Sequence, residues 1–348
     1  MTEAAVITLE RVWKVFGPHA DQALAAARAG MPKAQIFERF NCILGVSNAS
    51  LSVGRGEIFC VMGLSGSGKS TLVRHINRLL EPSAGRVLIE GEDILAKSPA
   101  ELRDLRARRI GMVFQNFGLL PHRTVRENVS LPLEIQGAPL RERHALAEAA
   151  LARVDLSGWG DRLPASLSGG MQQRVGLARA LAADPPILLM DEPFSALDPL
   201  IRRQLQDQFL SLSREIGKTT VFITHDLDEA IRIGTRIAIM KDGVIVQTGT
   251  PEQIVAEPAD SYVADFVAHI SRLHVVHAHR IMEPLAEYLS RNPGADLNGA
   301  PAARPGMTLA QLITLAQASE APLVVQDDGR PAGVIDRTRL LRSIQKEP

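Results

Sequence analysis

The sequence predicts an α/β fold in which helices flank a parallel β-sheet, and two observations lead to this prediction. Apolar runs rich in β-branched residues alternate with helical segments from about residue 58 to residue 240, which is typical of a parallel sheet covered by helices. A glycine-rich phosphate-binding pattern also lies directly between one such run and a helix, as such loops require. A shift in composition after about residue 272 indicates a smaller second domain.

Composition excludes several classes of protein. The 348 residues are 45% hydrophobic and 22% charged, which is an ordinary globular balance. Lys and Arg together number 39, as do Asp and Glu, so the zero net charge gives no reason to expect a nucleic-acid partner. Two cysteines are too few for a disulfide scaffold. The sequence also lacks a membrane-spanning run and a secretory signal pattern, so we expect a cytosolic protein.

The N-terminal region is expected to form two strands separated by helices. Residues 6–16 and 46–53 alternate in polarity as strands do. Residues 21–29 are rich in alanine and are followed by a glycine, which predicts a helix that ends there. Residues 32–40 begin with a proline and have the pattern of a short amphipathic helix. We therefore expect a helical insertion over residues 18–45.

The central region is expected to carry the phosphate loop and a helical subdomain. The apolar run Ile58–Met62 predicts a buried strand, and residues 71–80 predict the helix that follows the loop. Residues 86–90 and 111–115 predict two short strands. A capping-box pattern then opens a mostly helical stretch, so the helical subdomain is expected at about residues 116–182.

The remaining part of the chain is expected to complete the sheet and to form the second domain. Residues 187–190, 220–224 and 236–240 are apolar and β-branched, which predicts three more buried strands. An Asp-Gly pair after the last of them predicts a hairpin turn. Residues 307–345 predict the order helix, strand, Asp-Gly turn, strand, helix.

The octet GLSGSGKS at residues 63–70 fits the phosphate-binding pattern G-x-x-x-x-G-K-[ST]. Its glycines allow backbone N–H groups to point inward at an anion, and the following helix adds the positive end of its dipole. Lys69 can reach the β- and γ-phosphates, and Ser70 can place its hydroxyl on Mg²⁺. A turn that binds nothing is disfavoured because strand, loop, Lys-Ser and helix occur in order. The predicted phosphate-binding residues are Gly63, Ser65, Gly66, Ser67, Gly68, Lys69, Ser70 and Thr71.

Two further segments carry chemistry. The buried run Ile187–Met190 is followed by Asp191 and Glu192. An Asp at the end of such a strand can hold Mg²⁺ near a phosphate loop, and the adjacent Glu192 can polarise a water. Ser168, Gly169 and Gly170 open a helix, which makes a second anion site or an ordinary helix cap.

Taken together, these segments resemble the ATP-binding-cassette (ABC) ATPases over about residues 6–272. The resemblance implies a P-loop NTPase core with a parallel sheet, an antiparallel β edge and a helical subdomain. Gln115 is similar to the Q-loop glutamine that senses metal and water, and His225 is similar to the switch histidine that contacts the γ-phosphate. Asp198 lies in a segment, Ser195–Asp198, similar to the D-loop at the dimer seam. Phe16 matches the aromatic residue that stacks on adenine, with Trp13 as the alternative.

The resemblance also implies a mechanism and its cofactors, ATP and Mg²⁺. In the ABC family, an LSGGQ-type segment completes the nucleotide site of the opposite subunit in a head-to-tail dimer. Here that segment is Ser168-Gly169-Gly170, with Met171 in the fifth position. The implied catalytic residues are Glu192, His225 and Gln115, and the implied metal residues are Ser70, Gln115 and Asp191.

Longer blocks narrow the resemblance to importer ATPases for glycine betaine or proline. These blocks are residues 63–82, 191–202 and 224–232, with residues 38–45 before the second strand. The resemblance implies the ATP-hydrolysing subunit of an importer for a quaternary amine or osmoprotectant: glycine betaine, choline, carnitine or proline. It implies a homodimer of ATPase subunits, transmembrane permease subunits, an extracytoplasmic substrate-binding protein acting indirectly, and a peripheral location on the cytoplasmic face of the cell membrane. Residues 117–122 would border the groove for the permease or simply pack internally.

Residues 321–341 resemble a single CBS module, a type that senses ionic strength or nucleotides. The implied domains are an ABC ATPase domain at 1–272 and a C-terminal regulatory-type region at 273–348, with the CBS-like module at about 307–345. Ligand binding, dimerisation and a vestigial role all remain open for it.

Several alternatives remain for this sequence. An importer ATPase for another small solute such as an amino acid fits the same site residues, and a soluble non-transport ABC ATPase fits less well. His274, His277 and His279 form either a metal site or part of an ordinary linker or strand. The basic run of four arginines between residues 103 and 109 is either a solvated helix face or a contact with anionic lipid.

Overall fold

The computed structural model describes residues 5–195, 197–295 and 297–344. The chain divides between Thr248 and Gly249 into two compact units, each with its own hydrophobic core. Ala196, within the D-loop-like segment, and residue 345, the predicted end of the C-terminal module, lie outside the described residues.

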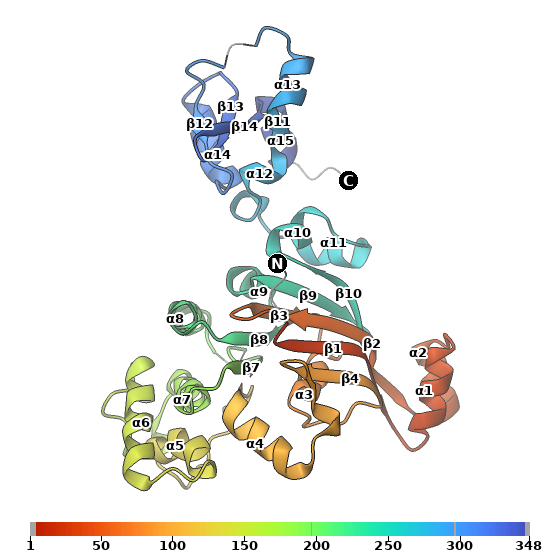
Figure 1. Cartoon of the computed structure of the whole chain (residues 1–348), viewed down its shortest axis with the longest axis vertical. Coiled ribbons are helices and arrows are strands. Elements are labelled where there is room, and N and C mark those ends of the chain that lie inside the picture. The colour runs from red at the N-terminus through yellow and green to blue at the C-terminus, as the bar shows by residue number, and fades with distance from the viewer. Residues whose placement is uncertain (1–4, 196, 296, 345–348) are drawn as a thin grey trace. The chain divides into compact units, whose positions relative to one another are not determined.

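The first unit contains a six-stranded sheet in the order β10-β9-β3-β8-β7-β6 (Figure 1). The pairings from β9 through β6 are parallel, as the predicted alternation of strands and helices requires. Strands β3, β7 and β8 are buried along their whole length, which explains their continuous apolar runs. The bounds are β3 Ile58–Met62, β6 Ile110–Val113, β7 Ile187–Asp191, β8 Thr219–Thr224, β9 Arg236–Lys241 and β10 Val244–Gly249.

A second sheet in this unit has four antiparallel strands in the order β2-β1-β4-β5. The predicted antiparallel edge is therefore a separate sheet. Its apolar residues share one core with the parallel sheet and with α3 (Lys69–Ile76), so the helix after the phosphate loop is held between two sheets. The bounds are β1 Ile7–Phe16, β2 Ile43–Val53, β4 Ala84–Ile89 and β5 Glu92–Asp93.

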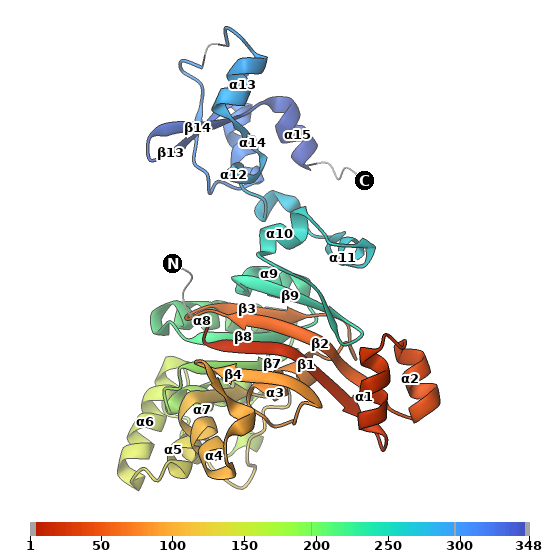
Figure 2. The ribbon, with the colours of Figure 1, turned by 45° about the vertical axis from the view of Figure 1, so that its right-hand side comes forward.

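Helices α1 (Ala20–Arg28) and α2 (Lys33–Phe40) form the predicted insertion between β1 and β2. They enclose a small core of their own with Val15 and Leu44 from the flanking strands. Figures 1 and 2 show these two helices at one end of the first unit and α5, α6 and α7 at the opposite end.

The predicted helical subdomain contains three separate helices, α5 (Val125–Ile135), α6 (Leu140–Arg153) and α7 (Gly169–Ala182), that pack on one another. A capping box at Thr124 begins α5, and Ser168 caps α7. The stretch between α6 and α7 is not α-helical, in contrast to the expectation of a mostly helical segment. The other helices of the unit are α4 Pro99–Arg109, α8 Pro199–Ile216 and α9 Leu227–Ile233.

The second unit contains a four-stranded sheet in the order β11-β14-β13-β12. Its core includes Leu309, Leu312, Val325 and Ile335, and the predicted order of elements over residues 307–344 is present. Residues 275–306, in which the sequence shows no clear module, supply the two outer strands, because two-residue strands leave no periodicity to read. The bounds are α10 Pro251–Ala256, α11 Ser261–Val267, α12 Ala278–Ile281, β11 Glu283–Pro284, α13 Leu285–Arg291, β12 Ala302–Ala303, α14 Leu309–Gln317, β13 Leu323–Asp327, β14 Arg330–Ile335 and α15 Arg337–Ile344.

The division into compact units falls before the predicted domain boundary at 272 and 273. Helix α10 belongs with the second unit because its Glu252 accepts hydrogen bonds from the backbone and ring of His277 and approaches the ring of His279. The predicted boundary rests on the shift in composition and on the family resemblance, and it stays a prediction.

Candidate functional site

The phosphate loop joins β3 to α3 in the predicted order, and close backbone approaches require its glycines. A Cβ on Gly63 would lie 2.2 Å from the carbonyl oxygen of Met240, and one on Gly68 would lie 2.3 Å from that of Gly45. Both glycines also have positive φ, a region that side chains disfavour. No side chain caps α3 at Gly68, so its first N–H groups are available to a ligand.

Lys69 is buried at the start of α3, with only 4% of its surface exposed. Its ammonium donates to the carbonyls of Gly63 and Leu64 at 2.8 and 3.0 Å and lies 3.9 Å from Glu192. Burial lowers the pKa of Lys69, and the nearby carboxylates of Glu192 and Asp191 oppose that shift. The loop therefore holds a cation at the position where an anionic ligand would meet it.

Ser70 and Asp191 meet where a divalent cation would be held. The Ser70 hydroxyl donates to Asp191 Oδ1 at 2.8 Å, although the two residues lie on α3 and at the end of β7. Arg74, one helical turn after Ser70, reaches Asp191 Oδ2 at 3.3 Å. A hydroxyl and a carboxylate are oxygen ligands of the kind that Mg²⁺ prefers, so these donors fit the ion.

Glu192 lies at the centre of the site. Its carboxylate is approached by Lys69, by His225 Nδ1 at 3.1 Å and by Gln115 Nε2 at 3.4 Å. Its φ is 45°, an uncommon conformation for a non-glycine residue and one that is often found at functional sites. The three residues predicted as catalytic therefore meet, although Gln115 lies in the loop after β6 and not in the strand predicted there.

The structure distinguishes the two aromatic candidates near the loop. The Phe16 ring is 38% exposed, and a Cβ on Gly45 would lie 2.7 Å from that ring. Gly45 in turn touches Gly68, so Phe16 lies beside the phosphate loop. Trp13 packs against the core of the helical insertion instead. The geometry thus favours Phe16 over Trp13 as the exposed ring near a ligand.

The Ser-Gly-Gly segment lines a pocket that is separate from the phosphate loop. Ser168, Gly169, Gly170 and Asp198 line it with the start of α8, and no described residue of the phosphate loop contributes to it. The Ser168 hydroxyl accepts from Met171 N at 3.4 Å, and Asp198 accepts from Ile201 N at 3.1 Å, so both cap helices. Within one chain, these four predicted residues are therefore not brought together with Lys69.

The remaining predicted residues follow the course of the loop. Ser65 and Gly66 are exposed at its tip, and Thr71 is half-buried in the first turn of α3. Ser67 is buried, its carbonyl accepts from Gly243 N at 2.9 Å, and no partner is found for its hydroxyl among the described residues. The loop is therefore supported by the β9–β10 hairpin.

Sequence reasoning missed three residues at this site. Arg74 contacts Asp191, and its signal was the i+4 spacing from Ser70 on one helix face. Gly45 lies between Phe16 and Gly68, and no sequence pattern indicated it. Arg179, on α7, donates to the carbonyls of Phe117 and Gly118 in the loop that carries Gln115.

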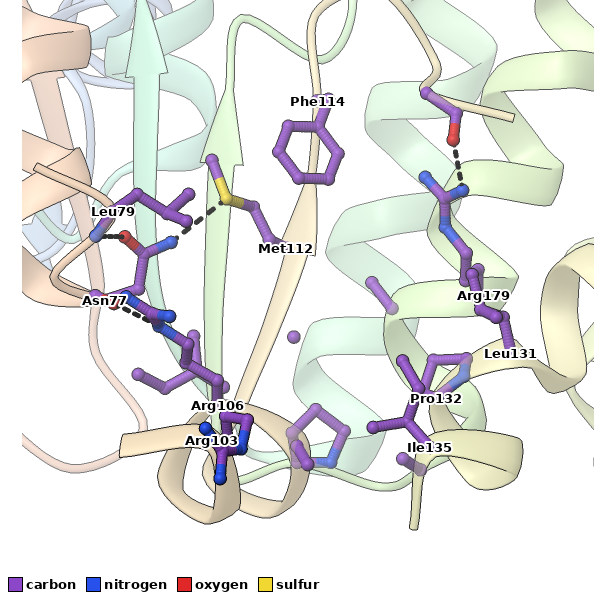
Figure 3. Close-up of a pocket in the computed structure, with 17 residues that line it drawn as sticks. Asn77, Leu79, Arg103, Arg106, Met112, Phe114, Leu131, Pro132, Ile135 and Arg179 are labelled. Atoms are coloured by element: carbon purple, nitrogen blue, oxygen red, sulfur yellow. Dashed lines mark hydrogen bonds between the residues drawn. The ribbon is translucent and has the colours of Figure 1, made fainter. Parts of the chain in front are cut away.

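Beside this loop the first unit has an apolar cavity of about 470 Å³ (Figure 3). Phe114 and Gly118 line it from the loop, Leu131 and Ile135 from α5, and Arg179 from α7. Of the segment 117–122 that sequence analysis placed at a groove, only Gly118 lines this cavity.

Two further segments singled out by the sequence are the histidines near residue 277 and the basic run on α4. Among the described residues, no group of three His, Cys, Asp or Glu side chains is placed to hold a metal ion. In the basic run on α4, Arg106 donates to the carbonyls of Asn77 and Arg78, and Arg109 pairs with Glu90. Arg106 and Arg109 therefore make contacts within the protein, whereas Arg103 and Arg108 are exposed on the helix face.

The fold and the site define a P-loop nucleotide-binding protein with the segments of an ABC ATPase, and comparison with known proteins agrees. The sequence profile of the ABC transporter family matches residues 46–195. A solved dimeric ABC transporter cassette, MJ0796, superposes with a TM-score of 0.60 at 35% identity, covering 70% of this chain and 98% of that one.

Two curated relatives extend the similarity. The glycine betaine/carnitine transport ATP-binding protein GbuA of Listeria monocytogenes is 52% identical over 79% of this chain and 70% of its own length. The trimethylamine N-oxide transport ATP-binding protein TmoW of Ruegeria pomeroyi is 46% identical over 98% of this chain and 97% of its own. The chain belongs to the ABC transporter family, and it is an ATPase of the ABC type. No helix in the described part of the chain is long and apolar enough to cross a membrane.

Proposed function

We propose that this chain is the ATP-hydrolysing subunit of an importer that takes up a quaternary amine or osmoprotectant through a separate permease. The observation that carries the catalytic part is the convergence of Lys69, His225 and Gln115 on Glu192 at the end of a buried strand. The cargo class is supported by the similarity to a glycine betaine/carnitine transport protein.

In this proposal the chain's residues bind the triphosphate and activate a water. The loop N–H groups and the Lys69 ammonium bind the β- and γ-phosphates. The Glu192 carboxylate accepts a hydrogen bond from the attacking water and takes its proton as general base. His225 and Gln115, both within hydrogen-bond range of Glu192, orient that carboxylate and contact the γ-phosphate side of the site. Phe16 stacks on the adenine base.

Mg²⁺ would be held by Ser70 and Asp191, with Gln115 nearby, and would neutralise phosphate charge when bound. The close Ser70–Asp191 contact supports these two as the ion's protein ligands. Arg74 lies 3.3 Å from the second oxygen of Asp191 and so helps to orient that carboxylate.

A second copy of the chain completes each site in this proposal. A pocket separate from the phosphate loop is lined by Ser168, Gly169, Gly170 and Asp198. These residues can therefore bind the nucleotide that is held by the phosphate loop of a partner subunit. The solved relative is described as a dimeric cassette, which supports the same arrangement here. Two ATP molecules would then lie between two copies.

The partners proposed for this chain are transmembrane permease subunits and, indirectly, an extracytoplasmic substrate-binding protein. The apolar cavity beside the Gln115 loop supplies a surface of suitable character for a permease segment. The protein would therefore lie at the cytoplasmic face of the cell membrane as a peripheral subunit.

The test of the catalytic part is Glu192→Gln, which keeps the size of the side chain and removes its basicity. The variant is expected to bind ATP and to form a dimer in light scattering, but to lose steady-state hydrolysis. Glu142→Gln, at an exposed position on α6, is the matched control and is expected to hydrolyse ATP normally. Retained turnover in Glu192→Gln would remove the role assigned to this carboxylate.

The test of the cargo is uptake in a strain lacking the gene and complemented with either the wild type or the Glu192→Gln allele. Labelled glycine betaine, choline, carnitine, proline and trimethylamine N-oxide would be compared. Trimethylamine N-oxide is the second candidate, because the relative named for its transport matches nearly the whole chain. A compound whose uptake is restored by the wild-type allele alone is the cargo. If neither allele restores uptake of any of the five compounds, the proposed cargo class is wrong, and the ATPase role is unaffected.

A further inference from the structure

The loop between β6 and α5 carries Gln115 and is fastened by two buried polar side chains. Asn128 on α5 accepts from Leu120 N at 2.7 Å and donates to the carbonyls of Leu120, Arg123 and Thr124. These contacts hold the later part of the loop to α5. The earlier part, next to Gln115, is held by a different side chain from a different helix.

That side chain is Arg179, in the third turn of α7. It donates to the carbonyl of Gly118 at 2.5 Å (Figure 3). It also donates to the carbonyl of Phe117 at 2.7 Å. It is only 7% exposed, and burial lowers its pKa. Within the described residues no carboxylate forms an ion pair with it, so the two carbonyls are what stabilises a buried charge that would otherwise be costly.

The backbone that receives these hydrogen bonds is sharply bent. Phe117 and Gly118 both have positive φ, 52° and 58°, and Gly118 N donates to the carbonyl of Asn116 across a tight turn. Phe117 is not a glycine, so this conformation needs support from its surroundings. Arg179 supplies that support directly, because its two donors reach both carbonyls of the bend.

Gln115 lies two residues before this bend, and its amide contacts Glu192 at 3.4 Å. One end of the segment is therefore set by the end of β7, and the other by α7. The intervening Asn116 leaves little slack, since one residue spans at most about 3.6 Å. A change in the position of Arg179 must be passed on to Gln115.

We propose that Arg179 is a positioning residue: it fixes the Gln115 loop to α7 and thereby sets the distance of the Gln115 amide from Glu192. This inference rests on the proposed role of Gln115 in hydrolysis. The same helix begins at Ser168, about 16 Å along the axis from Arg179 at 1.5 Å per residue. The helix that carries the Ser-Gly-Gly segment is thus also the one that holds the Gln115 loop.

The test is Arg179→Lys, assayed as Mg-ATP hydrolysis by the purified chain. Lysine keeps the charge but, as a point donor on a flexible stem, cannot span both carbonyls as the planar guanidinium does. We expect kcat to fall by about 10- to 100-fold, as small misplacements of catalytic groups do, with KM changed by less than about twofold. Arg126→Lys on α5, whose native partners are Glu148 and Asp161, is the matched control and should retain kcat.

A double-substitution cycle separates positioning from a general loss of structure. In a Gln115→Ala background, Arg179→Lys should cause no further loss of kcat, because the group that it positions is already absent. Gly118→Ala disturbs the same bend from the loop side, since Gly118 has a positive φ of 58° that residues with a side chain disfavour. It should reproduce the loss of kcat even if Arg179→Lys lowers the unfolding temperature too far for assay.

Equal losses of kcat from Arg179→Lys in the wild-type and Gln115→Ala backgrounds would overturn the inference, as would an unchanged kcat. A raised KM at constant kcat would overturn it too, because it would indicate a binding role. If Gln115→Ala itself keeps the wild-type kcat, the proposed role of Gln115 fails. Any loss of kcat in Arg179→Lys would then have a cause other than the position of Gln115, and the inference about Arg179 would fail as well.

Discussion

At the residue scale, the site depends on how a few charged groups balance one another in a partly buried place. Lys69 is buried, yet its ammonium has two carbonyl partners and a nearby carboxylate. Glu192 in turn is contacted by Gln115 Nε2 at 3.4 Å and by His225 Nδ1 at 3.1 Å. Both side chains are therefore held in position by protein partners before any ligand arrives, which is the preorganisation that catalysis requires.

We predict that Lys69→Ala weakens ATP binding by about 10- to 100-fold, since hydrogen bonds to charged groups contribute about 1.5–3 kcal/mol. The affinity would be measured by titration with a fluorescent ATP analogue. Lys97→Ala, which removes an exposed ion pair with Glu92, should bind the analogue like the wild type. Equal affinities for both variants would contradict the assignment of Lys69.

A second residue-scale prediction concerns Glu229, a buried carboxyl on α9. Burial raises its pKa, and it accepts from Gln206 Nε2 at 2.8 Å. Between its ordinary and its raised pKa the folded chain binds more protons than the unfolded chain, so stability falls as pH rises through that window. Glu229→Gln keeps an acceptor for Gln206 and removes the charge.

Glu229→Gln should therefore raise the unfolding temperature at about pH 8, by roughly 2–4 °C for each kcal/mol of relieved cost. The gain should shrink as pH falls toward the ordinary carboxyl range. Thermal unfolding followed by circular dichroism at several pH values measures this, with the exposed Glu142→Gln as control. A gain that is constant with pH would show that relief of a buried charge is not the cause.

At the scale of elements, the nucleotide site is assembled where two sheets and one helix come together. The phosphate loop ends β3, α3 lies in the core shared by both sheets, and β2 brings Gly45 against Gly68. The contact is possible because Gly68 has no side chain, since a Cβ there would lie 2.3 Å from the carbonyl oxygen of Gly45. Phe16 then lies over Gly45, so the position of the ring depends on this approach.

We predict that Gly45→Ala displaces the Phe16 ring while leaving the fold intact. The new Cβ would lie 2.7 Å from the ring, and Gly45 is not at positive φ. Loss of an aromatic contact of about 0.5–1.5 kcal/mol should weaken ATP binding by about two- to tenfold. Gly306→Ala, whose added Cβ meets open space, is the control. The affinity of both variants for ATP would be measured by titration. An unchanged affinity in Gly45→Ala would contradict the proposed contact of Phe16 with the adenine base.

At the scale of the whole molecule, the chain contains two compact units with separate cores. The nucleotide site lies entirely in the first, so a ligand that binds the folded site stabilises that unit by mass action. The second unit carries none of the predicted site residues.

We predict two thermal transitions in calorimetry of the full chain. Saturating Mg-ATP, added to the Glu192→Gln variant to avoid turnover, should raise one transition, by about 2.7 kcal/mol of stability at 100 times Kd. Leu312→Ala, in the buried core of the second unit, should lower the other by about 2–5 kcal/mol. A single transition that both changes shift would contradict independent units.

The sequence alone predicted much of this protein because its strongest signals are local. The octet at residues 63–70, the apolar run before Asp191 and Glu192, and the Ser-Gly-Gly helix start each lie within a few consecutive residues. The similarity to ABC transporter proteins confirms the family and the fold predicted from them. The roles of the individual site residues stay predictions that the substitutions above test.

What only the tertiary structure decided are the contacts between residues far apart in sequence. The hydrogen bonds of Arg179 to Phe117 and Gly118 and the approach of Gly45 to Gly68 leave no local pattern in the sequence. The two-residue strands β11 and β12 likewise take their conformation from the sheet that they join. Local chain signals report backbone preference and polarity, whereas these contacts exist only after packing has brought distant elements together.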